Sequence, residues 1–270
     1  MIGCGLVLFT LSIQAQEKKT QAQEKKINGR FGVEMGFHEF FGKTVKPEQV
    51  RTLKSIDIGE SSSYKYNDDA YMGNHNSENG FEKLHVGIKY EALFFKNRFG
   101  VATGIRFSQI SSSLEHNRKY NYFIWMLRQD ETTTDYLTIR SIYQKSHYFC
   151  IPLEIRFFPA KADRHVKQYF KIGGALNYRF STKNDIDFHE RGMAKHAEQI
   201  DAEIVTPCTF SGFISPAVGI RIGKNKKPWV SVEFQIPGFI IAERPHAFVR
   251  PDFGIGVQCS VMFPLNKTTH

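Results

Sequence analysis

The sequence lacks any apolar run that could cross a membrane as a helix. Such a helix needs about 20 consecutive apolar residues, and the chain of 270 residues contains no run of that length. Apolar residues are nevertheless abundant, at 41% of the chain with 24 phenylalanines, while the mean hydropathy is negative. This mixture excludes a helical membrane protein and favours strands in which apolar and polar side chains alternate.

Cysteine is scarce and has no metal-binding spacing. Of the four cysteines, Cys4 falls in the apolar N-terminus, and Cys150, Cys208 and Cys259 are widely separated. Because no CxxC pair occurs, the sequence predicts neither a zinc site nor a disulfide framework. We expect isolated packing residues, with Cys150 and Cys259 on opposite faces of their strands.

Recognisable catalytic motifs are also missing. There is no GxSxG, no HExxH and no glycine-rich phosphate loop, which are the patterns that mark common hydrolase and nucleotide sites. His189 lies close in sequence to Asp185, Asp187 and Glu190, but these residues match no known catalytic arrangement. We therefore predict that the protein is not an enzyme, with no catalytic, cofactor-binding or metal-binding residues and no cofactor.

The N-terminus is typical of an export signal. Residues 2–13 are almost wholly apolar and too short to span a bilayer, and Ser12 and Ala15 suit a cleavage site. No Lys or Arg precedes the apolar run, which departs from the usual signal. We predict a cleaved signal peptide at 1–15 and a flexible periplasmic leader at 16–29. The alternative for the apolar segment is a buried N-terminal strand.

Eight segments alternate apolar and polar residues with a period of two. In one of them, Ile151, Leu153 and Ile155 alternate with Glu154 and Arg156. Most segments match the roughly 9–11 residues that a tilted strand needs to cross a membrane. The eight segments are Arg30–Phe41, Lys83–Phe95, Phe99–Ser111, His147–Phe158, Gln168–Ser181, Phe210–Gly223, Pro228–Pro237 and Asp252–Leu265.

The connections between these segments alternate between short and long in chain order. Outer-membrane barrels place short turns in the periplasm and long loops outside. The pattern therefore predicts an all-β fold, an eight-stranded antiparallel up-and-down transmembrane β-barrel over 30–265, followed by a polar tail at 266–270. The short connections are 96–98, 159–167 and 224–227, and the long ones are 42–82, 112–146, 182–209 and 238–251.

Charged residues keep to one face of the segments. Each Lys or Arg facing lipid near the midplane would cost roughly 2–4 kcal/mol, so a membrane barrel must turn its apolar face outward and its charges inward. An eight-stranded barrel is filled by its own side chains, and six bases and four acids can pair there. This predicted lumen charge ladder consists of Glu34, Lys89, Glu91, Arg106, Glu154, Arg156, Lys171, Arg179, Arg221 and Glu233.

Aromatic residues gather near the ends of the segments. Membrane barrels carry aromatic girdles at both interfaces, so we predict one at each end, with random scatter in a Phe-rich chain as the alternative. The periplasmic girdle would hold Phe94, Phe99, Phe157, Tyr169, Trp229 and Phe263, and the outer one Phe40, Phe149 and Phe180.

Two segments resemble the PorT-like outer-membrane barrels. They are Ile151–Phe158, with the sequence IPLEIRFF, and Phe253–Leu265, with the sequence FGIGVQCSVMFPL. The likeness in layout extends from Arg30 to Leu265. It implies an outer-membrane β-barrel domain of the kind often labelled porin-like, and no single activity. The polar tail departs from barrels that end on an aromatic residue.

The expected function is structural or surface-interacting, in a bacterial outer membrane. The net charge of +9 is spread along the chain, which favours outer-membrane lipid and lipopolysaccharide over nucleic acid. Long loops rich in Ser, Asn and Tyr suit a surface or envelope protein partner, and insertion implies the barrel-assembly machinery. The alternatives are a narrow passive pore for small solutes, an outer-membrane hydrolase, and a soluble periplasmic ligand-binding barrel.

Overall fold

The computed structural model describes seven stretches of the chain. These are residues 28–45, 81–115, 122–128, 134–160, 164–224, 227–242 and 246–265. The predicted signal peptide, most of the leader and the tail at 266–270 lie outside the described residues. The first strand begins at Asn28 and the last ends at Pro264.

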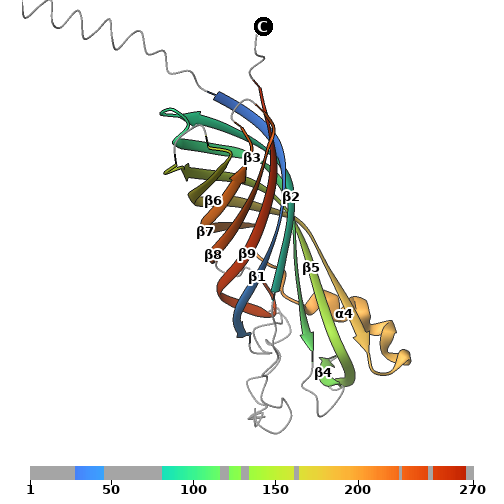
Figure 1. Cartoon of the computed structure of the whole chain (residues 1–270). Helices are drawn as coiled ribbons and strands as arrows, with labels where there is room; N and C mark the ends of the chain where they lie inside the picture. The colour runs from blue at the N-terminus through green and yellow to red at the C-terminus, as the bar shows by residue number, and fades with distance from the viewer. Residues whose placement is uncertain are drawn as a thin grey trace, which may run out of the picture.

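Eight strands close into a ring, as the sequence predicted (Figure 1). Each strand pairs with the next one in antiparallel fashion, and β9 returns to pair with β1. The ring is therefore an up-and-down barrel. Its strands are β1 (Asn28–Thr44), β2 (Phe81–Phe94), β3 (Phe99–Glu115), β5 (Thr134–Phe157), β6 (Val166–Phe188), β7 (Phe210–Ile222), β8 (Trp229–Ile241) and β9 (Val249–Pro264).

The pleat of each strand separates the two kinds of side chain. Because successive side chains point to opposite faces, an alternating sequence places all apolar residues on one side of the wall. Leu153 is 60% exposed on the outside of β5, whereas Arg156 is 1% exposed on the inside. Cys150 is buried and Cys259 is partly exposed, each as a free thiol, which confirms that they lie on opposite faces.

One side of the barrel extends well beyond the rest. The strand β5 begins at Thr134 and β6 ends at Phe188, whereas the sequence predicted loops over much of this region. A further strand, β4 (Phe123–Arg128), pairs with β5. These parts of the long-loop prediction were wrong because the strict alternation of apolar and polar residues fades there, although the backbone pairing continues.

A short helical segment packs against this extension. It consists of the 3-10 helix η2 (Arg191–His196) and the helix α4 (Ala197–Glu203), which lie beside β4 and β5 in Figure 1. Ile200 of α4 is fully buried in the same apolar cluster as Trp125 and Leu137. In the described part of the chain, no helix is both long and apolar enough to cross a membrane.

The barrel interior is layered from one end to the other. At the end with the short turns, Trp229, Tyr169 and three further side chains form an apolar cluster. The opposite end carries the β4–β5 hairpin and is called the hairpin end below. There, Phe40, Phe81 and Phe213 belong to a larger apolar cluster. Buried polar and charged side chains occupy the space between the two clusters.

Candidate functional site

A network of eight charged side chains fills the middle of the barrel. They come from six strands, and none is more than 6% exposed. Four are acids and four are bases, so the network is neutral as a whole. Its members are Glu34 on β1, Lys89 and Glu91 on β2, Arg106 on β3, Glu154 and Arg156 on β5, Lys171 on β6 and Glu233 on β8.

Glu154 is the centre of this network. Its carboxylate contacts all four bases: Lys89 Nζ at 2.9 Å, an Arg156 nitrogen at 3.0 Å, Lys171 Nζ at 3.5 Å, and Arg106. A buried charge is costly unless opposite charges and hydrogen bonds compensate for it. The convergence of four cations on one carboxylate makes Glu154 the residue on which the balance of the network depends most.

The remaining acids each contact at least one base. Arg156 donates hydrogen bonds to Glu91 at 3.1 Å and to Glu233 at 2.5 Å. Lys171 also pairs with Glu233, which accepts a further hydrogen bond from the Tyr169 hydroxyl at 2.7 Å. Charge-assisted hydrogen bonds of this kind are roughly twice as strong as neutral ones, so they hold β2, β5, β6 and β8 together from inside.

Uncharged polar residues continue the network toward the hairpin end. Gln258 donates a hydrogen bond to Glu34 at 2.9 Å and accepts one from Gln235 at 2.9 Å. Gln235 in turn contacts the ring nitrogen of His38 at 2.7 Å, and the His38 ring stacks on His85 with 5.5 Å between centroids. The interior is thus occupied by side chains well beyond the charged layer.

Two predicted members of the ladder lie away from the network. Arg179 is half-buried toward the hairpin end and donates a hydrogen bond to the Thr182 hydroxyl at 3.2 Å. Arg221 is buried toward the turn end, where its guanidinium stacks over Trp229. The ladder predicted from the sequence therefore divides into a central group of eight and one arginine toward each end.

The predicted ladder leaves out several buried polar residues on the same inner face. Arg30 stacks its guanidinium 3.6 Å from the centre of the Trp229 ring, and Lys83 lies 4.3 Å from the Phe213 ring. His85 and Lys167 are also buried. Alternation could have found all four, because each is an even number of residues from a predicted ladder member on its own strand.

The nine residues of the predicted aromatic girdles divide between the two faces of the wall. Six members lie on the outward face of their strands and are exposed or half-exposed: Phe94, Phe99, Phe149, Phe157, Phe180 and Phe263. The assignments of Tyr169, Trp229 and Phe40 were wrong, since all three are buried inside the barrel. Their place near a strand end suggested a girdle, but the pleat continues to the ends and turns these three inward.

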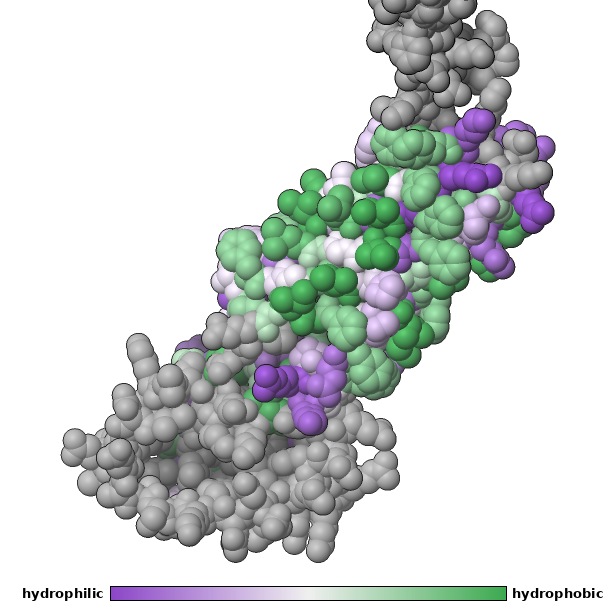
Figure 2. Space-filling model, turned by 90° about the vertical axis from the view of Figure 1, so that its left-hand side faces the viewer, coloured by the Kyte–Doolittle hydropathy of each residue, from purple (hydrophilic) through white to green (hydrophobic). Residues whose placement is uncertain are grey.

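The outer wall carries a broad apolar belt. Large side chains such as Ile151, Ile172 and Val257 are 44–69% exposed there. Figure 2 shows, on the face turned to the viewer, apolar side chains gathered along the middle of the wall and polar side chains toward its ends. A contiguous apolar surface of this kind marks contact with a membrane or another protein.

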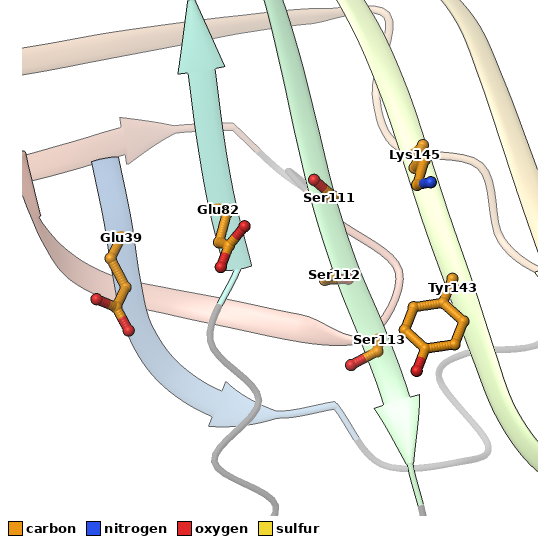
Figure 3. A pocket seen from close by; sticks show the side chains of 7 residues that line it. All are labelled: Glu39, Glu82, Ser111, Ser112, Ser113, Tyr143 and Lys145. Carbon is orange, nitrogen blue, oxygen red and sulfur yellow. The ribbon is translucent and has the colours of Figure 1, made fainter. Parts of the chain in front are cut away.

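A cavity of about 320 Å³ lies on the outer face of the wall, near the hairpin end (Figure 3), and is called the outer-rim cavity below. Four neighbouring strands contribute to it. Its lining is polar and carries both signs of charge: Glu39 of β1, Glu82 of β2, Ser111, Ser112 and Ser113 of β3, and Tyr143 and Lys145 of β5.

In the part of the chain that the structure describes, the histidines of the predicted loops do not gather into a catalytic arrangement. His75 and His116 lie outside the described residues. The His189 ring packs beside Tyr122, with 4.9 Å between centroids, and burial lowers the pKa of His246 to about 3. Among the residues with described positions, no three His, Cys, Asp or Glu side chains are grouped to hold a metal ion.

Comparison with known proteins gives similarity to solved barrels alone. No family model matches the chain, and no curated protein matches it. The N-terminal β-barrel domain of Pseudomonas aeruginosa OprF is similar over 88% of this chain and 100% of that one, with 6% identity and a TM-score of 0.30. The outer membrane protein OprG from Pseudomonas aeruginosa is similar over 88% of this chain and 94% of that one, with 12% identity and a TM-score of 0.33.

Proposed function

We propose that the chain is an outer-membrane β-barrel protein with a structural or surface-interaction role, and that paired charges seal its interior. The observation that carries the proposal is the sidedness of the closed wall. Large apolar side chains face outward all round the ring, while the charged residues in the middle of the same strands are buried. A soluble barrel would require the opposite arrangement, because its apolar side chains would fill the core.

The height of the apolar belt supports the membrane location. Five outward residues of β5, from Phe149 to Phe157, cover eight steps of roughly 3.4 Å along the strand, or about 27 Å. With a strand tilt of about 40°, this length corresponds to about 21 Å along the barrel axis, close to the apolar band of about 25 Å in membrane barrels. The belt therefore suits the hydrocarbon layer of a bilayer.

The two ends of the barrel differ in a way that supports one orientation. The β2–β3 connection occupies only residues 95–98, whereas β5 and β6 extend far past the belt at the other end. Outer-membrane barrels keep short turns in the periplasm and expose their longer segments. We therefore place the turn end in the periplasm and the hairpin end, with β4 and α4, at the cell surface, with insertion by the barrel-assembly machinery.

The filled interior favours a closed barrel over a passive pore. Apolar clusters occupy both ends of the lumen, and the neutral charge network lies between them. A solute crossing the barrel would have to displace side chains that hold buried charges. The role that remains is mechanical or adhesive. The parts of β5 and β6 that project beyond the belt, together with β4 and α4, would carry this role at the surface. There, Trp125 donates a hydrogen bond to Glu203 of α4 at 2.9 Å. The resemblance to PorT-like barrels implies an outer-membrane barrel and no single activity.

Two measurements test this proposal. Folded protein in outer-membrane-like vesicles should migrate differently on gels before and after boiling, and spin labels at 153 and 231 should report lipid and a shielded interior, respectively. In planar bilayers, pure protein should give no large stable openings. A water-exposed label at 153 would reject the membrane location. Large stable conductance would reject the sealed interior and support the pore.

A further inference from the structure

The outer-rim cavity is built from one transverse row of residues on the outer wall. Glu39 pairs in register with Glu82, Glu82 with Ser111, and Ser111 with Lys145. The row therefore carries two carboxylates, then a hydroxyl, then an amino group, across four strands. With strands about 4.8 Å apart, it covers about 14 Å. Ser113 and Tyr143, which are also in register, form the next row outward.

The charges of this row lack partners of opposite sign in the described part of the chain. The two carboxylates lie directly opposite each other on neighbouring strands, an arrangement that destabilises strand pairing. Neither they nor Lys145 take part in any ion pair that joins described residues. A ligand that offers hydroxyl or amino donors at one end and an anionic group at the other would satisfy both halves of the row.

The surface beside the cavity is apolar on the side of the belt. Phe37 and Leu84 are exposed on the same face, two residues along the strands from Glu39 and Glu82. Two residues correspond to about 7 Å. A molecule whose polar part occupies the cavity can therefore lay an acyl chain directly over the belt, which a soluble sugar cannot do.

We propose that the cavity lined by Glu39, Glu82, Tyr143 and Lys145 binds the phosphorylated sugar headgroup of an outer-leaflet glycolipid. Lys145 contacts a phosphate, the two carboxylates accept hydrogen bonds from sugar hydroxyl or amino groups, and the half-exposed Tyr143 ring covers a sugar face. The inference rests on the proposed membrane location, with the hairpin end at the outer leaflet. It adds a specific headgroup site to the general attraction between a basic protein and anionic lipid.

Lysine substitutions separate this site from general charge attraction. The full chain is refolded in neutral detergent and titrated with bisphosphorylated lipid A, dephosphorylated lipid A, phosphatidylglycerol and glucosamine 6-phosphate. Lys145→Gln should weaken binding of the bisphosphorylated form about tenfold or more, the range for a hydrogen bond to a charged group, and leave the dephosphorylated form unchanged. The control is Lys224→Gln, an exposed lysine just after β7 at the turn end of the barrel and outside the cavity lining. It should change binding less than twofold.

The carboxylates give an independent result. The double variant Glu39→Gln/Glu82→Gln should weaken the binding of both forms of lipid A to a similar extent. The reason is that the two carboxylates contact sugar groups that both forms share. Equal effects of the two lysine variants would overturn the proposal, and so would phosphatidylglycerol binding as tightly as lipid A. Competition by glucosamine 6-phosphate at equal concentration would assign the cavity to a soluble sugar phosphate instead.

Failure of this inference can be distinguished from failure of the membrane proposal. Every variant is checked for the gel shift on boiling and for insertion into vesicles. A barrel that inserts but binds lipid A equally with and without Lys145 disproves the headgroup site alone. A wild-type barrel that does not enter vesicles disproves the membrane location, and with it the outer-leaflet assignment.

Discussion

Replacing Glu154 with glutamine is the sharpest test of the buried charge network. The change keeps the shape of the side chain and removes one negative charge from a site where four cations converge. The network then holds four bases and three acids, so one of its positive charges is left without compensation. Because the network is almost completely shielded from solvent, water cannot replace the lost interaction.

The expected loss of stability is large. Removing one partner of a buried ion pair costs about 3–5 kcal/mol, and a typical folding free energy is about 5–15 kcal/mol. Removing Lys89 as well should recover part of this loss, because the balance returns to three acids and three bases. Each remaining acid then keeps a base that it already contacts: Glu34 with Arg106, Glu91 with Arg156, and Glu233 with Lys171.

The measurement is equilibrium urea unfolding in phospholipid vesicles, followed by tryptophan fluorescence. Wild type, Glu154→Gln, Lys89→Gln and the double variant form a cycle, and the double variant should be more stable than the sum of the single effects predicts by at least about 1 kcal/mol. The slope of stability against urea must stay constant for the four values to be comparable.

Two outcomes would refute this reasoning. A Glu154→Gln barrel within about 0.5 kcal/mol of wild type, the usual range for a surface substitution, would mean that water enters the lumen and screens the charges. Strict additivity of the two substitutions would mean that Lys89 and Glu154 do not interact. Either result would contradict the sealed interior and reopen the alternative of a narrow pore.

Other predictions concern packing, pH and orientation. Gly219→Ala should destabilise the barrel by about 1–3 kcal/mol, because the added methyl group would overlap the Tyr169 ring, which packs on this glycine. Gly192→Ala, where a methyl group meets open space, is the control and should change stability by less than about 0.5 kcal/mol. Burial holds the pKa of His246 at about 3, so the unfolded state binds more protons between pH 6.5 and 3, and stability falls as the pH drops through this range. This histidine alone should contribute about 2 kcal/mol to the loss at pH 5, measured by urea unfolding as the difference between wild type and His246→Asn in the stability lost between pH 7 and pH 5. With single-cysteine variants, an impermeant maleimide should label Cys208, at the hairpin end, on intact cells. It should label the buried Cys150 only after unfolding. Protection of Cys208 from the maleimide on intact cells would reverse the orientation.

The sequence by itself determined the number of strands in the ring and the face that each presents in the middle of the wall. A strand has a side-chain period of two, so alternation is readable without knowing any neighbour. The same rule would have placed Arg30 inside and kept Tyr169, Trp229 and Phe40 out of the girdles, had it been applied to the ends of the strands. In contrast, the alternation of apolar and polar residues is too weak in the outer hairpins to predict β4 or the extension of β5.

Only the tertiary structure decided which charges meet. Glu34 accepts a hydrogen bond from Gln258, 224 residues away, because β9 pairs with β1. Arg106 reaches Glu154 because β3 pairs directly with β5, although β4 lies between them in the chain. Such contacts depend on the register of every strand pair and on closure of the ring, which no local pattern specifies. The same is true of the outer-rim cavity, whose charges stand in one row only because four strands bring them to the same height.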